Sequence, residues 1–85
     1  MHEMSLALEV GRLVELELRR TPGRLLRVGV VVGREAGVEP ENLAFCLEAV
    51  LAHPPFGGAR PVLRQVPGDE LRLDYLEVDD GRADD

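Results

Sequence analysis

The sequence predicts an α+β domain in which two helices pack on one face of a three-stranded sheet. Two segments place apolar residues at helical spacing, and three others alternate apolar with polar residues as strands do. Their order is helix, strand, helix, strand, strand, and a sheet with one apolar face needs helices to cover it. A chain of 85 residues can form one such domain.

The first helix is expected over residues 4–20, where Ala7, Gly11 and Val14 recur at three- and four-residue spacing. It should end at Thr21-Pro22-Gly23, because proline lacks the helical donor and glycine permits the chain to reverse.

The remaining elements follow from alternation and from proline. We expect a strand over 25–32 and a second helix beginning at Pro40, since proline suits the first helical position. Two further strands are expected over 60–66 and 70–78. The apolar parity of the last strand changes partway, which predicts a β-bulge near Tyr75.

The expected core consists of inward-facing apolar residues from all five elements. They are Met4, Leu8, Val14, Leu18, Val28, Val30, Val32, Leu43, Leu47, Val50, Leu63, Leu71 and Leu73. The first helix has more apolar residues than one small sheet can cover, namely Leu6, Val10, Leu13 and Leu16. Surplus apolar surface of this kind predicts a contact with another chain.

Composition excludes several classes of function. The formal net charge is −6, which argues against binding to nucleic acid or to an anionic membrane surface. The single cysteine, Cys46, excludes an internal disulfide and a cysteine-based zinc site within one chain. No segment has the pattern of a signal peptide or a membrane span. We therefore expect a cytoplasmic protein.

Met1, His2 and Glu3 form the strongest candidate site. His2 offers its imidazole and its main-chain nitrogen to one ion, and the Met1 amine and the Glu3 amide lie one residue on either side. Closely spaced nitrogens suit the tetragonal coordination that Ni(II) and Cu(II) favour. Alternatively, Glu3 simply places an acid at the start of the helix, which the helix dipole favours without any metal.

The other candidate residues have simpler explanations. His53 should be a surface residue near the end of the second helix, and Cys46 should be a buried apolar residue, with no histidine placed to activate its thiol. Glu35, Glu39 and Glu41 lack the spacing of a catalytic pair. No nucleophile or phosphate-binding loop is recognisable, so we expect a protein that is not an enzyme.

Several stretches together resemble one family, and they occur in that family's order. These are Met1-His2-Glu3-Met4-Ser5-Leu6-Ala7, Val32-Gly33, Gly37-Val38-Glu39-Pro40-Glu41, Leu43 and Phe45, Gly58-Ala59, Val66-Pro67, Gly68-Asp69-Glu70-Leu71-Arg72 and Leu76-Glu77-Val78. They resemble the hydrogenase and urease nickel-incorporation proteins of the HypA type. The resemblance implies a nickel domain over 1–78, and we expect an acidic, disordered tail over 79–85.

The chain departs from this family in one respect. The family carries a zinc-binding module with paired C-x-x-C motifs between the second and third strands, whereas here Val66-Pro67 runs directly into Gly68. Proline and glycine predict a compact turn there between adjacent strands. We therefore expect no zinc.

The resemblance implies a nickel-binding, metallochaperone-like protein that assists Ni(II) insertion into a hydrogenase or a urease. The implied ligands are Met1, His2 and Glu3, and the implied partner is a maturation GTPase or a nickel-enzyme precursor. A homodimer is an alternative use of the surplus apolar face. The alternative function is that of a metal-free paralogue acting as a protein–protein interaction module.

Overall fold

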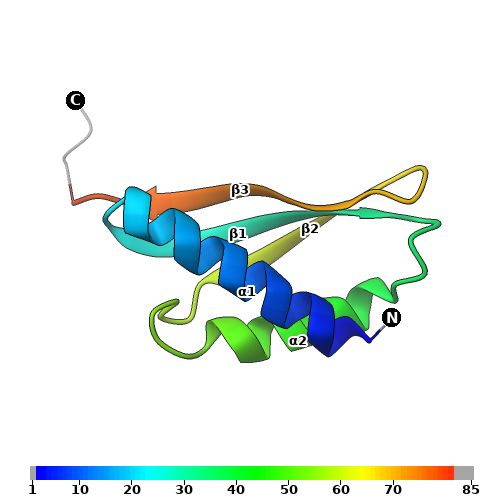
Figure 1. Cartoon of the computed structure of the whole chain (residues 1–85), viewed down its shortest axis with the longest axis horizontal. Helices are drawn as coiled ribbons and strands as arrows, with labels where there is room; N and C mark the ends of the chain where they lie inside the picture. Colours follow the sequence, from blue (N-terminus) through cyan, green and yellow to red (C-terminus); the bar gives the residue numbers. More distant parts are fainter. Residues whose placement is uncertain (1, 82–85) are drawn as a thin grey trace.

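The computed structural model describes residues 2–81 and has the predicted α+β architecture. Its elements are α1 (Glu3–Arg20), β1 (Arg24–Gly33), α2 (Pro40–Leu51), β2 (Arg60–Val66) and β3 (Leu71–Asp79). Both helices lie on the same face of the sheet (Figure 1). The predicted elements are confirmed with ends shifted by about one residue, as is usual for helix and strand termini. Met1 and residues 82–85 of the predicted tail lie outside the described residues.

The strand order is β2-β1-β3, with β1 parallel to β2 and antiparallel to β3. The prediction of a turn between adjacent strands is therefore wrong, because β1 lies between β2 and β3. The connection instead passes over the end of β1, where the Arg34 N–H donates to the Val66 carbonyl at 2.8 Å and the Glu35 N–H donates to the Gly68 carbonyl at 2.8 Å. Gly33 lies beneath this connection, and a Cβ there would overlap the Gly68 carbonyl oxygen.

The predicted bulge in β3 is confirmed. Gly29 of β1 pairs with Tyr75 and Val30 pairs with Leu73, so Asp74 has no opposite residue. The extra residue changes the parity of the strand. As a result both Leu73 and Leu76 pack against the core.

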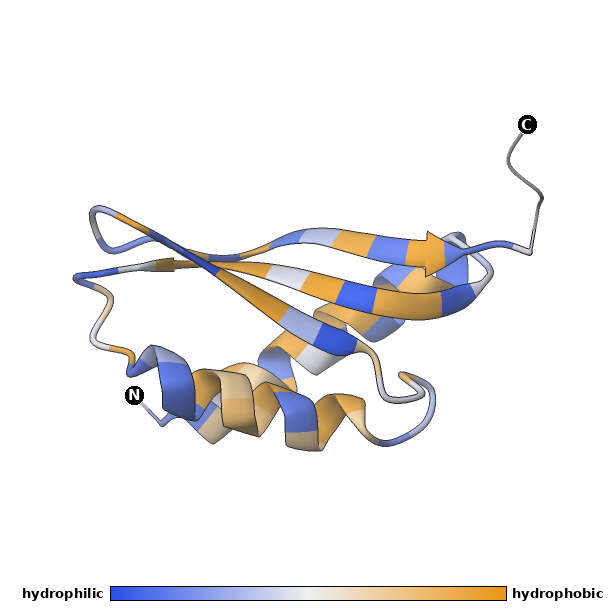
Figure 2. Cartoon of the chain, turned by 180° about the vertical axis from the view of Figure 1, so that it is seen from behind, coloured by the Kyte–Doolittle hydropathy of each residue, from blue (hydrophilic) through white to orange (hydrophobic). Residues whose placement is uncertain are grey.

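The core lies between the sheet and the helices, and it is built mainly from Val and Leu. Its largest fully buried side chains are Leu43, Leu47, Leu51, Val14, Val28, Val30 and Val32. Among the residues predicted in the core, Leu18, Val50, Leu63, Leu71 and Leu73 are only partly buried and pack around its margin. Figure 2 shows the resulting alternation of apolar and polar residues along the strands.

Two core predictions on α1 are wrong. Met4 and Leu8 are 42% and 59% exposed, whereas Ala7, Val10 and Val14 of the same helix are buried. The reason is the close packing of α1 on α2, where a Cβ on Gly11 would lie 3.0 Å from Val50. Small residues permit this approach, so they take the inward positions and the larger side chains lie outside.

The surplus apolar residues of α1 divide into two pairs. Val10 is a core residue and Leu6 is partly buried against the core, which corrects their assignment to a free surface. Leu13 and Leu16 are 36% and 43% exposed, as the prediction of a contact surface requires. Within residues 2–81 no helix combines the length and the apolar character needed to cross a lipid bilayer.

Candidate metal centre

His2 is the residue that precedes α1, and within residues 2–81 its side chain has no hydrogen-bond partner. Its backbone is extended (φ −79°, ψ 132°), and its carbonyl accepts a hydrogen bond from the Leu6 N–H at 3.3 Å. Residues in this position commonly use a side-chain oxygen to accept from the first helical N–H groups. The exposed imidazole of His2 makes no such bond. Both ring nitrogens therefore stay available to another ligand.

Glu3 joins the start of α1 to the start of α2. One oxygen, Oε2, accepts from the main-chain N–H of Glu39 at 3.1 Å, and the other, Oε1, accepts from Asn42 Nδ2 at 2.8 Å. Both carboxylate oxygens are thus already hydrogen-bonded. These two hydrogen bonds hold the main chain beside His2 in a fixed position relative to α2.

Glu39 is the N-cap residue of α2, and it also takes part in the contact with Glu3. Its Oε2 accepts from the Asn42 N–H at 2.8 Å, and its Oε1 accepts from the Glu41 N–H at 3.3 Å. In a capping box, the third helical residue reaches back to the main-chain N–H of the capping residue. Here the carboxylate of Glu3, from the other helix, accepts the hydrogen bond from the main-chain N–H of Glu39 instead. The two helix starts therefore share one hydrogen-bond network.

The network lowers the pKa of Glu3 below its ordinary value of 4.5. The main cause is the hydrogen bond from the Glu39 main chain, followed by the bond from Asn42 and by the N–H of Glu3 itself. Each of these donors stabilises the ionised carboxylate. Glu3 is consequently ionised at neutral pH.

Side chains alone do not form a metal site in the part of the chain that is described. Among residues 2–81 there is no group of three or more His, Cys, Asp or Glu side chains that could hold an ion. The first N–H groups of a helix, in contrast, have no intrahelical partner. At the start of α1 such main-chain N–H groups lie next to the His2 imidazole.

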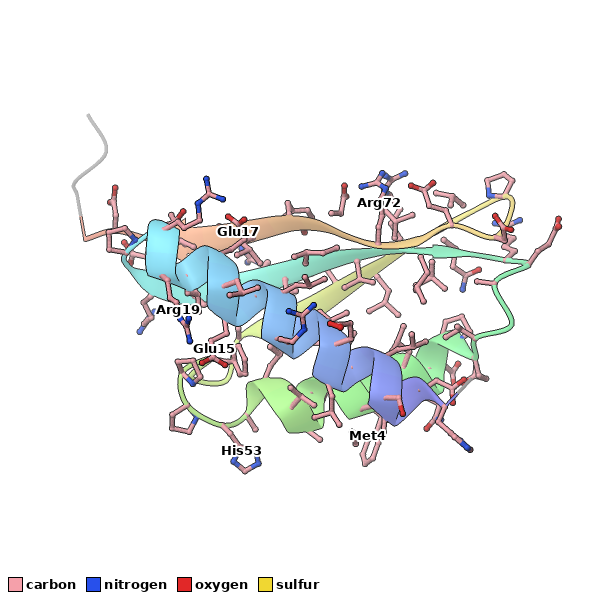
Figure 3. All side chains as sticks on the ribbon, in the orientation of Figure 1. Met4, Glu15, Glu17, Arg19, His53 and Arg72 are labelled. Carbon is pink, nitrogen blue, oxygen red and sulfur yellow. The ribbon has the colours of Figure 1, made fainter. Side chains whose placement is uncertain are left out.

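The structure does not bring the other candidate residues to this end. His53 is exposed just beyond α2, at the end of the helix opposite to the chain start (Figure 3). Cys46 is 7% exposed and belongs to the core, as predicted. Sequence reasoning placed Glu39 at the start of the second helix but missed its capping role and the part of Asn42. Glutamate is not among the residue types preferred at a helix cap, so the residue before Pro40 gave no such signal, and nothing local indicates a partner 39 residues away.

The comparisons with known proteins identify one family. The family model for hydrogenase/urease nickel incorporation, metallochaperone, hypA, matches residues 1–71, which include α1, β1, α2 and β2. The hydrogenase maturation factor HypA of Chlorobium limicola is 50% identical over 50 residues, which are 58% of this chain and 43% of that protein. That of Dechloromonas aromatica is 45% identical over 69 residues, which are 80% of this chain and 61% of that protein.

A third relative matches over most of the chain. The HypA protein of Paracoccus denitrificans is 36% identical over 84 residues, which are 94% of this chain and 74% of that protein. The chain spans 43% and 61% of the first two relatives, so it corresponds to only part of their length. With a family match over residues 1–71 and this identity to a curated member, the chain belongs to the HypA family of nickel-incorporation metallochaperones.

Proposed function

We propose that this chain carries Ni(II) as cargo at Met1, His2 and Glu3 and passes it to a maturing hydrogenase or urease. The observation that carries the proposal is the free imidazole of His2, held one residue before a helix whose start is anchored to α2. The anchor limits the motion of the main-chain nitrogens next to the imidazole. Binding therefore costs less conformational entropy than in a loose terminal peptide.

The ligands are the His2 imidazole and main-chain nitrogens at Met1, His2 and Glu3. Four nitrogens in this arrangement match the square-planar preference of Ni(II). An amide nitrogen binds the ion only after losing its proton. The Glu3 carboxylate stays in place, because Glu39 and Asn42 still hold it.

Electrostatics explain why acidic residues accompany this site. The start of a helix has a partial positive charge, which opposes a cation. The carboxylates of Glu3, Glu39 and Glu41 belong to the two helix starts and offset that charge. We propose that these carboxylates help to retain the ion and that Glu3 acts through position and charge, without its oxygens binding nickel.

The partner that receives the metal is a maturation GTPase or a nickel-enzyme precursor in the cytoplasm. The protein binds and releases its cargo without catalysing a reaction. It needs no zinc, because its only cysteine is buried in the core. A chelator should therefore leave the far-ultraviolet circular dichroism of the metal-free protein unchanged.

A second candidate is a metal-free interaction module, which exposed apolar side chains favour. Phe45 of α2 and Leu8 of α1 are 70% and 59% exposed, and Met4 is 42% exposed. Exposed side chains of this size on two adjacent helices are typical of a protein contact. The two candidates differ in whether nickel binds at all.

Calorimetric titration of the untagged protein with Ni(II) separates them. We expect binding that strengthens with rising pH, because the imidazole, the amine and the amides must lose protons. His2→Ala should abolish it, and so should acetylation of the Met1 amine, which removes that nitrogen as a ligand. His53→Ala is the matched histidine control and should bind like the parent. Equal affinity in all four proteins would eliminate the nickel site and favour the interaction module.

A further inference from the structure

We propose that two copies of this chain associate through the outward face of α1, with the two helices antiparallel. The contact surface consists of Glu9, Leu13, Leu16 and Arg20, which we call the outer stripe. All four side chains are exposed. Their spacing of four, three and four residues places them on one face of the helix, opposite the buried Val14.

The apolar centre of the outer stripe is not covered by the chain itself. Leu13 and Leu16 are 36% and 43% exposed, and with Leu73 of β3 they line an open hollow between α1 and the sheet. The hollow exists because α1 packs on α2 and leaves Leu73 at the margin of the core. A leucine from a second molecule would find apolar atoms on both sides of this hollow.

The charges at the ends of the outer stripe identify the occupant as another copy of the same chain. Glu9 lies at one end and Arg20 at the other, with the two leucines between them. When a two-fold axis passes between residues 14 and 15, Leu13 faces Leu16 of the partner copy and Glu9 faces Arg20 of the partner copy. A parallel pair of helices would instead place Glu9 opposite Glu9 and Arg20 opposite Arg20, so that like charges face each other. The pattern is thus self-complementary only in the antiparallel arrangement.

The spacing is also that of a helix–helix seam. A repeat of four and three residues lets side chains of one helix fit between those of another. Glu9 already contacts Arg12 at 2.7 Å and Arg20 contacts Glu17 at 3.9 Å, but these pairs are exposed and stabilise the monomer little. Glu9 and Arg20 can therefore be shared with a partner copy at small cost.

The expected dimer is weak. Four residues on one helix form a contact far smaller than the roughly 1,600 Å² of a standard interface. Association should therefore depend on protein concentration and on salt, since the charges are exposed. The outer stripe begins two helical turns after His2, so a dimer of this kind leaves the proposed nickel site open.

Sedimentation velocity of the untagged protein over a concentration series tests the proposal through charge exchange. Glu9→Arg alone and Arg20→Glu alone each place like charges opposite one another, and each should weaken association by about tenfold or more. The protein with both substitutions should dimerise again. An equimolar mixture of the two single variants should also associate, because every charged pair in the mixed dimer is then opposite in sign.

Matched controls come from the same helix. Glu15→Arg reverses a charge that lies off the outer stripe and does not line the hollow, and it should not change the dimer. Leu16→Glu should remove the dimer, and Leu8→Glu, on another face of α1, should not. A parent protein that sediments as a 9.4 kDa monomer at every concentration overturns the proposal. So does a dimer that the single charge variants leave intact, or single variants that do not associate when mixed.

Discussion

The ring of Tyr75 in β3 lies across Gly29 of β1, in the space that a Cβ on residue 29 would occupy. The two residues are directly paired in the antiparallel ladder, next to the bulge at Asp74. An aromatic ring that covers a glycine on a neighbouring strand shields the main chain, which has no side chain of its own there. Gly29 alternates with Val28 and Val30, which face the core, so this contact lies on the opposite face of the sheet.

Gly29→Ala should displace the Tyr75 ring and lower the free energy of unfolding by about 1 kcal/mol, as moderate overpacking does. The loss of stability should be at the low end of the range for overpacking, because the Tyr75 ring is 44% exposed and can move. Tyr75 is the single tyrosine and the chain has no tryptophan, so its near-ultraviolet circular dichroism reports this ring. In a Tyr75→Ala background, Gly29→Ala should no longer destabilise the protein. An equal loss in both backgrounds would show that the ring is not the cause.

Leu47→Ala should lower the free energy of unfolding by about 2–5 kcal/mol, because it leaves a cavity in the core. Leu47 is fully buried, whereas Leu8 is 59% exposed. Leu8→Ala removes the same atoms from the surface and should change stability by about 0.5 kcal/mol or less. Urea unfolding of both variants checks the assignment of the inward faces. Comparable losses for the two would mean that α1 buries Leu8 in solution.

Glu3→Gln should destabilise the protein at neutral pH, and its effect should diminish in acid. The hydrogen bond from Glu39 lowers the pKa of Glu3 in the folded state below 4.5. The ionised carboxylate therefore stabilises the fold fully above that value, and this contribution is lost as the pH falls through the folded pKa. Thermal unfolding between pH 7 and pH 3 should show the parent and the variant converging.

Two further variants test whether the network is the cause of that pH dependence. Asn42→Asp places a second carboxylate beside Glu3, so it should destabilise the protein most at neutral pH and recover as the pH falls. Glu15→Gln removes an exposed carboxylate from the same helix. The contact of Glu15 with Arg19 is long at 3.7 Å, so this substitution should change the free energy of unfolding very little. If Glu3→Gln and Glu15→Gln have the same thermal stability at every pH, the hydrogen bonds between the two helix starts contribute nothing to the stability of the fold.

The sequence by itself determined the elements, with their ends to within about one residue. Pro40 begins α2 and Pro22-Gly23 follows the end of α1, because proline restricts the backbone locally and glycine permits the chain to reverse, whatever the rest of the chain does. The bulge near Tyr75 was predictable too, since a change of apolar parity is a property of one segment. The chain start and its resemblance to a family likewise pointed to His2 without any knowledge of the fold.

Only the tertiary structure decided which faces and which strands meet. The first helix has more apolar residues than its buried face can hold, and the approach of α2 to Gly11 selected Ala7 and Val10 over Met4 and Leu8. The strand order depends on pairing between segments that no local pattern distinguishes. The link from Glu3 to Asn42 joins residues 39 positions apart. Contacts of this kind arise when whole elements pack together, so they exist only in the folded chain.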